Sequence, residues 1–131
     1  AEIDARILPG QRCEDLVSRI QETIDDPGIE VAVTLSFPSR SSSPDTPLFS
    51  ALTRLAHESD PDALVVPRVI QGFTDAHYFR EIGLTSYGFV PRWLTAAEAR
   101  GIHGANERVS IENLERGVRA SVRLLELLDG H

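Results

Sequence analysis

The sequence predicts an α/β protein, and three observations support this fold class. Short runs of alternating or continuously apolar residues, typical of strands, are separated by segments whose apolar residues recur at helical spacing. Turn-forming pairs such as Pro9-Gly10 end the runs. The 131 residues, 41% hydrophobic and 25% charged, suffice for one ordinary domain or two small lobes with a buried core.

The first 37 residues predict a strand, a helix and a second strand. Residues 2–8 alternate apolar and charged side chains with a period of two, as a strand with one exposed face does. Residues 11–24 predict a helix that the stretch 25–28, Asp-Asp-Pro-Gly, ends. Residues 29–37 alternate again and are rich in β-branched side chains. The helix carries the single cysteine, Cys13, which we interpret as a small buried thiol because one cysteine excludes an internal disulfide.

A polar segment then separates this first third from the rest of the chain. Residues 36–47 contain five serines and three prolines, which predicts a linker or hinge, the alternative being a long loop inside one domain. Thr46 is expected to cap a helix that ends near residues 59–61. The continuous apolar run 63–70 predicts a strand covered on both faces, and residues 85–91 predict another short strand.

Two more helices complete the prediction. A short helix is expected to follow Thr74 or Asp75, either of which can cap it, and Gly83 ends it. The last helix begins after Ser110, its expected cap. Its apolar stripe consists of Ile111, Leu114, Val118, Val122 and Leu125.

Composition excludes several classes of function. The formal net charge is −7 and the basic residues are scattered, which argues against nucleic acid as the main partner. No apolar run approaches the roughly 20 residues that span a bilayer, so we expect no membrane association and a cytoplasmic location. The sequence has no His-Glu-x-x-His motif, no Gly-x-Ser-x-Gly turn and no glycine-rich phosphate loop.

One of the four histidines has unusual surroundings. His57 and His131 are expected to be solvated, and His77 is expected at the surface or partly packed. His103 instead lies in a loop with Gly104 beside it, and glycine permits backbone angles that other residues resist. Such a loop beyond a strand end is a typical place for a site residue in an open sheet. From the residues alone, His103 is either a metal ligand or a residue of a surface turn.

Four stretches in one order resemble a known family. They are IDARILPG, GFTDAHYF, YGFVP and IHGANERVSIENL. Together they resemble the C-terminal part of the dizinc exopeptidase and deacylase family, which includes glutamate carboxypeptidase, carboxypeptidase S, aminoacylase, acetylornithine deacetylase and succinyl-diaminopimelate desuccinylase. The resemblance covers essentially all 131 residues and is nearest to the carboxypeptidase S-like branch.

The resemblance implies a domain organisation. Residues 1–37 would be the second half of a β-α-β lid and dimerisation domain, residues 38–47 the hinge, and residues 48–131 the C-terminal part of the zinc-peptidase α/β catalytic domain. A homodimer through the lid would follow. The chain begins at Ala1 and contains no methionine, from which we expect a piece of a longer polypeptide.

The resemblance also assigns roles to individual residues. His103 matches the last zinc ligand of a site that holds two zinc ions. Arg6 matches a lid arginine that contacts the substrate carboxylate, a task that suits a planar guanidinium. Gly72 and Thr74 match the turn that borders the substrate pocket, and Asp75 is expected to cap and brace this turn.

Two positions depart from the family pattern. Phe73 stands where relatives often have a small residue, and His77 stands where arginine is common. Both departures leave the fine substrate specificity undetermined.

We therefore expect the C-terminal fragment of a zinc-dependent carboxypeptidase or N-acyl amino acid amidohydrolase, which cleaves an amide bond near a free carboxylate of a peptide or N-acyl amino acid. The family's other metal ligands and the glutamate that acts as general base lie upstream of the lid. The chain contains no catalytic residue and is expected to be inactive alone, because catalytic zinc takes about three protein ligands. The alternatives are a non-catalytic dimerisation or binding module and a structural lobe without a site.

Overall fold

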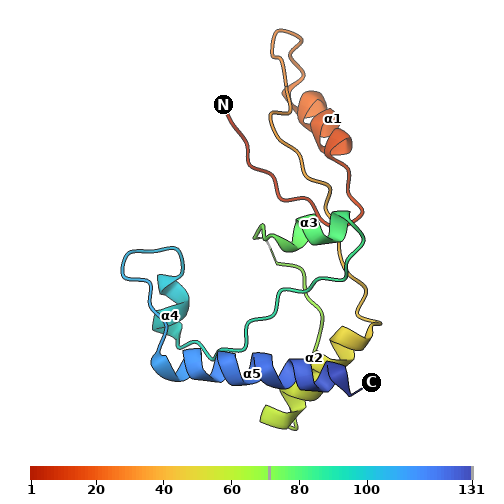
Figure 1. Cartoon of the computed structure of the whole chain (residues 1–131). Coiled ribbons are helices and arrows are strands. Elements are labelled where there is room, and N and C mark those ends of the chain that lie inside the picture. Colours follow the sequence, from red (N-terminus) through yellow and green to blue (C-terminus); the bar gives the residue numbers. More distant parts are fainter. Residues whose placement is uncertain (71, 131) are drawn as a thin grey trace. The chain divides into compact units, whose positions relative to one another are not determined.

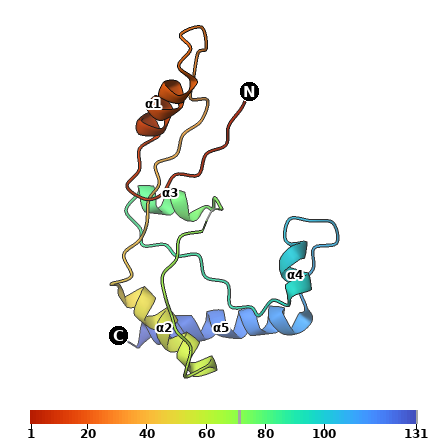
Figure 2. The ribbon, with the colours of Figure 1, turned by 180° about the vertical axis from the view of Figure 1, so that it is seen from behind.

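The computed structural model describes residues 1–70 and 72–130. Its regular elements are the helices α1 (Cys13–Ile24), α2 (Pro47–Ser59), α3 (Ala76–Glu81), α4 (Ala96–Gly101) and α5 (Ile111–Asp129), shown from two sides in Figures 1 and 2. Contacts divide the chain into two compact units. The first unit contains Ala1–Ser43 and Arg68–Tyr87, and the second contains Pro44–Pro67 and Gly88–His131.

The second unit is built around the helix pair α2 and α5. As predicted, Thr46 caps α2 by accepting a hydrogen bond from the backbone N–H of Phe49 at 3.1 Å. Ala51 and Leu55 of α2 are buried against Leu127 of α5, and this cluster is extended by the partly buried Ala120, Leu124 and Leu128. Burying one leucine side chain contributes about 1.5–3 kcal/mol, so these residues hold the pair together.

A charged contact joins the same two helices at the surface. The guanidinium of Arg123 in α5 binds both carboxylate oxygens of Glu58 in α2, at 2.7 and 2.9 Å. The hydrogen bond from Arg123 lowers the pKa of Glu58 below its ordinary value of 4.5, and partial burial opposes the shift. Arg123 also donates to Glu126 at 2.9 Å. This two-point contact joins the surfaces of α5 and α2 beside the apolar cluster.

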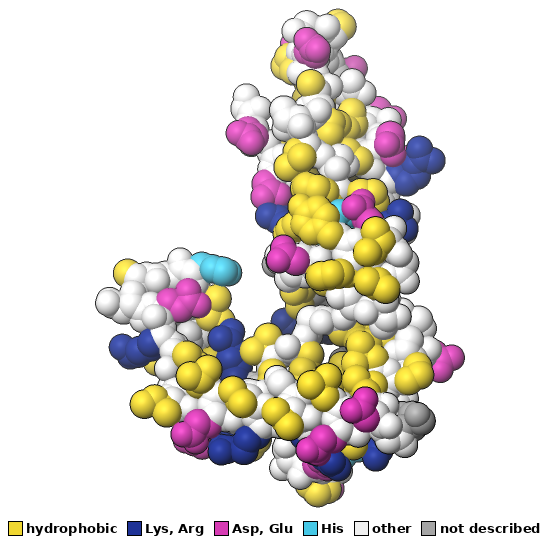
Figure 3. Space-filling view, in the orientation of Figure 1, with side chains coloured by type: hydrophobic (Ala, Val, Ile, Leu, Met, Phe, Trp, Pro, Cys, Tyr) yellow, Lys and Arg dark blue, Asp and Glu magenta, His cyan; other side chains and the backbone are white. Residues whose placement is uncertain are grey.

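The last predicted helix is confirmed, but its packing face differs from the prediction. Ser110 caps α5 by accepting a hydrogen bond from Asn113 N at 3.2 Å. The predicted apolar stripe is exposed: its five side chains retain between 53% and 77% of their accessible surface. Figure 3 shows hydrophobic side chains at the surface along α5. The expected core face therefore has no partner among the described residues.

The four predicted strands, at residues 2–8, 29–37, 63–70 and 85–91, are not formed. Within residues 1–70 and 72–130 these segments are irregular chain, and no strand is present. A strand is defined by a ladder of hydrogen bonds to a neighbouring strand, and alternation of side chains does not supply that neighbour. The α/β class is therefore not confirmed for this chain, which is helical.

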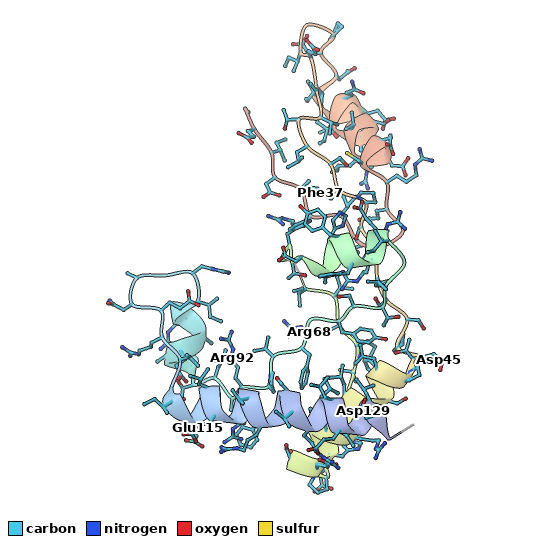
Figure 4. All side chains as sticks on the ribbon, viewed as in Figure 1. Phe37, Asp45, Arg68, Arg92, Glu115 and Asp129 are labelled. Atoms are coloured by element: carbon cyan, nitrogen blue, oxygen red, sulfur yellow. The ribbon has the colours of Figure 1, made fainter. Side chains whose placement is uncertain are left out.

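The first unit contains α1 and α3. The predicted helix over residues 11–24 is confirmed as α1, although Cys13 is half-buried instead of buried. Four rings gather around α3, with centroids 4.9–6.4 Å apart; they belong to Phe37, Phe73, His77 and Tyr78. Figure 4 shows Phe37 beside α3. Rings at these distances in tilted and edge-to-face arrangements stabilise one another.

The short helix α3 is confirmed, but its predicted cap is not. Asp75 occupies the N-cap position without a side-chain hydrogen bond, and Thr74 supplies its backbone oxygen, which accepts from His77 N at 3.0 Å. Gly83 follows the helix end with a φ of +84°, a conformation that glycine adopts without strain. No helix of the described residues is both long and apolar enough to cross a membrane.

Candidate functional site

The loop that carries His103 follows a helix that the sequence prediction missed. Thr95 and Glu98 form a capping box at the start of α4: the Thr95 side chain accepts from Glu98 N, and the Glu98 carboxylate accepts from Thr95 N at 2.9 Å. This backbone hydrogen bond, with a second from the Thr95 hydroxyl, lowers the pKa of Glu98. The Thr-x-x-Glu spacing was the signal for this helix.

The backbone turns sharply where α4 ends. His103 has a φ of +60° and Asn106 a φ of +62°, the left-handed region that histidine and asparagine tolerate better than most residues. Gly104 N donates to Gly101 O at 2.9 Å. A Cβ on Gly104 would approach that same oxygen to 3.3 Å, a tight contact, so the turn favours the small residue. The sequence Gly-Ile-His-Gly therefore forms a tight turn with the histidine at its tip.

The side chain of His103 is free to bind. Its backbone N–H donates to Glu107 Oε2 at 3.0 Å. This hydrogen bond closes the loop between the two residues and does not involve the imidazole. The imidazole is exposed and makes no hydrogen bond or ion pair to any residue that the structure describes. A histidine ring that neither packs nor bonds within its own unit has both nitrogens available for a ligand.

The described residues form no complete metal site. No group of three histidine, cysteine, aspartate or glutamate side chains that could hold a metal ion occurs among residues 1–70 and 72–130. Imidazole nitrogen is a preferred zinc ligand, so His103 fits as one donor. A hollow of about 260 Å³ lies in the same unit, lined in part by Glu98, Asn106 and Arg108. A complete metal site would need ligands from outside the described residues.

The predicted substrate residues lie in the first unit. The Arg6 guanidinium makes an ion pair with Asp4 at 2.8 Å, and both side chains are more than half exposed. Gly72 and Thr74 are exposed at the turn that leads into α3. Arg6, Gly72 and Thr74 thus share one unit, and His103 belongs to the other. The roles assigned to these four residues remain predictions.

The two positions that depart from the family pattern contact each other. The ring centroids of Phe73 and His77 are 5.3 Å apart, and His77 is 93% buried with no hydrogen bond on Nε2. The nearest acidic atom is Glu81 Oε1 at 3.4 Å, one turn further along α3. His77 is therefore a packed residue, as one of the two sequence-based interpretations expected.

Two arginines were missed by the sequence analysis. Arg40 and Arg80 line the same hollow in the first unit. A signal existed for Arg40, because it is the single basic residue within the serine-rich segment 36–47. No signal linked it to Arg80, since forty positions separate the two residues.

Comparison with known proteins identifies the family. The model of the peptidase family M20/M25/M40 matches residues 6–127. The chain therefore belongs to this family, which confirms the resemblance to the exopeptidase and deacylase family.

Curated relatives match nearly the whole chain. It is 32% identical over 131 residues to N-fatty-acyl-amino acid synthase/hydrolase PM20D1 of Xenopus tropicalis, covering 98% of this chain and 26% of the relative. It is 26% identical over 133 residues to the protein of that name in Mus musculus, with the same coverage. Probable carboxypeptidase S-like 2 of Dictyostelium discoideum is 24% identical over 118 residues, covering 88% of this chain and 23% of the relative. The chain thus spans about a quarter of the length of the relatives it matches.

Proposed function

We propose that the chain is the C-terminal piece of a zinc-dependent peptidase or amidohydrolase that cleaves an amide bond near a free carboxylate. Family membership over residues 6–127 supports a hydrolase. The names of the relatives, N-fatty-acyl-amino acid synthase/hydrolase and carboxypeptidase S-like protein, favour an N-acyl amino acid or a peptide as substrate. The observation that carries the proposal is the exposed imidazole of His103 at the tip of a tight turn.

His103 would hold one of two zinc ions through its imidazole. Bound zinc would supply Lewis-acid activation of water and polarisation of the amide carbonyl. The left-handed backbone at His103 and the Glu107 hydrogen bond fix the direction in which the ring projects. The remaining ligands and the general base would come from the three quarters of the relatives' length that this chain does not span. For this reason the chain alone is expected to be inactive.

Arg6 would bind the free carboxylate of the substrate, with Gly72 and Thr74 at the border of the pocket. The pair between Arg6 and Asp4 is exposed on both sides, and such surface pairs contribute only about 0–1 kcal/mol. A substrate carboxylate can therefore replace Asp4 at little cost, and a planar guanidinium binds carboxylates through two hydrogen bonds. The exposed glycine and threonine leave room for the substrate backbone.

We assign residues 1–37 to the lid and dimerisation domain, 38–47 to the hinge and 48–131 to the catalytic domain, with a homodimer through the lid. Exposed apolar residues in the first segment favour pairing: Ile3 and Leu35 retain 68% and 72% of their accessible surface. The same observation favours the second candidate function, a non-catalytic dimerisation module. Sedimentation separates the two readings, since dimer formation without hydrolysis by the longer protein would favour the module.

The proposed function is tested in the longer protein that contains this chain. Hydrolysis of N-acyl amino acids and dipeptides is measured with and without a chelator. His103→Asn removes the imidazole while asparagine tolerates the left-handed backbone, so kcat/KM should fall by roughly 100-fold or more. His57→Asn is the matched control, because His57 is exposed and its one hydrogen bond in the described chain goes to Ala63 O, so this variant should leave kcat/KM unchanged. Full activity of His103→Asn, or hydrolysis that a chelator does not affect, would refute the proposal.

A further inference from the structure

The first unit holds a hollow of about 310 Å³ whose charged lining is entirely basic. Arg40 and Arg80 line it together with the hydroxyl residues Ser41, Ser42 and Thr85. Among the described residues, none that lines it is acidic. The chain has 20 acidic and 13 basic residues, and several arginines outside this hollow, such as Arg116 and Arg123, pair with carboxylates.

Hydrogen bonds fix the walls of this hollow. Arg80 donates from Nε and Nη2 to Ser86 O at 3.1 and 2.9 Å, which sets the plane of its guanidinium. The Ser42 hydroxyl donates to Ser86 O and accepts from Ser86 N, both at 3.0 Å. Tyr87 donates from its hydroxyl to Ser43 O at 2.5 Å. The serine-rich segment is thereby pinned to the segment after α3, 44 positions away.

The two arginines differ in how they are held. Arg80 is half-buried and its hydrogen bonds go to a neutral carbonyl, so its positive charge is not neutralised by them. Arg40 is exposed and makes no hydrogen bond or ion pair within the part of the chain that the structure describes. Two like charges on one hollow repel each other, and a bound anion removes that repulsion.

We propose that this hollow binds a small carboxylate, held by Arg40 and Arg80 and by hydrogen bonds from the hydroxyls of Ser41 and Thr85. Guanidinium groups bind carboxylates through charge-assisted hydrogen bonds, and hydroxyls donate to the remaining lone pairs. The proposal rests on the proposed function for the identity of the ligand, which is the free carboxylate of an N-acyl amino acid or peptide. It adds a carboxylate site whose arginines, unlike Arg6, make no ion pair with any residue that the structure describes.

The binding test uses the 131-residue chain and acetate, followed by backbone amide shifts in NMR at constant ionic strength with chloride as reference. Adding acetate should shift the amide resonances of residues 40–42 and 83–86, and the shifts should reach a plateau at high acetate concentration. Arg40→Gln should weaken binding about tenfold or more, because hydrogen bonds between charged groups are lost. This variant is expected to keep the fold, since Arg40 is exposed and makes no hydrogen bond or ion pair in the described chain. Arg119→Gln, on the exposed surface of α5, is the matched control and should bind like the parent chain.

Several results would overturn the proposal. These are the absence of saturable shifts, equal shifts with chloride, or unchanged binding in Arg40→Gln. The same titration is repeated with inorganic phosphate. If phosphate binds more tightly than acetate, the carboxylate proposal is wrong and the ligand of this hollow is a phosphoryl group. In the longer protein, Arg40→Gln should raise KM and leave kcat unchanged. If KM is unchanged in Arg40→Gln, the proposed carboxylate site is refuted and the proposed function is not. If the chain binds acetate but the longer protein hydrolyses no substrate, the proposed function is refuted and the carboxylate site is not.

Discussion

The helix pair α2–α5 and the first unit are stabilised in different ways. The buried apolar residues of the described chain are Ala51, Leu52, Leu55 and Leu127, and all of them belong to α2 or α5. In the first unit the buried residue is a histidine, His77, surrounded by rings that are themselves 37–50% exposed. One region has an aliphatic core, and the other has an aromatic cluster and hydrogen bonds between side chain and backbone.

The two regions differ in whether their apolar side chains have a packing partner within the described chain. The helices α2 and α5 contact each other within the chain, so their apolar residues are covered. The apolar segments that were predicted as strands have no such partner, and Leu64, Val66 and Leu35 retain 60–87% of their accessible surface. Within residues 1–70 and 72–130, these apolar side chains are therefore left largely uncovered.

The largest effect is expected from removing a side chain of the aliphatic core. Leu127→Ala should cost about 2–4 kcal/mol of unfolding free energy, because it removes a side chain that is 97% buried and leaves a cavity. Leu125→Ala is the matched control on the same helix, since Leu125 is 64% exposed and should change the free energy by less than about 0.5 kcal/mol. Urea unfolding followed by circular dichroism measures both. Equal effects would show that α5 packs through its other face.

Substituting the helix caps should have a smaller effect on the unfolding free energy, and this effect should differ between the cap of α5 and that of α3. Ser110→Ala removes the hydroxyl that accepts from Asn113 N and should cost about 1 kcal/mol. Asp75→Ala should change the free energy by less than about 0.5 kcal/mol, because Asp75 makes no cap hydrogen bond at the start of α3. The same urea experiment tests both variants. A cost of Asp75→Ala as large as that of Ser110→Ala would contradict the difference between the caps.

The smallest effect concerns the pH dependence of the α2–α5 contact. The folded-state pKa of Glu58 lies below its ordinary value of 4.5, so the ionised carboxylate stabilises the fold above that value, and the contribution is lost as pH falls through the folded pKa. The difference in urea midpoint between the parent chain and Glu58→Gln should therefore be constant near neutral pH and shrink below about pH 4.5. A difference that grows on acidification would contradict this assignment.

The sequence predicted the helices better than their environment. Thr46 and Ser110 marked helix starts correctly because a cap is a local interaction between neighbours in the chain. The helix α4 was missed although its Thr95-x-x-Glu98 box is equally local. The strands and the packing face of α5 depend on which surfaces lie opposite, and the pattern of one segment does not contain that information.

The candidate site shows the same limit. The glycines and the histidine of residues 101–104 indicated a special turn, and the left-handed backbone at His103 agrees with it. The hollow between Arg40 and Arg80 was not foreseen, because hydroxyl hydrogen bonds from Ser42 to Ser86 create it across 44 positions. Family resemblance supplied the roles of Arg6, Gly72, Thr74 and His103, and the His103→Asn variant tests the last of them.

The pairing of α2 with α5 has a consequence for the chain between them. Leu55 and Leu127 meet although they are 72 positions apart, so the core closes a long loop. The entropy of loop closure grows only with the logarithm of length, and twenty additional residues would cost about 0.2 kcal/mol. The segment that carries α3, α4 and the His103 turn can therefore change in length with little effect on the core, which leaves this part of the chain free to diversify for recognition.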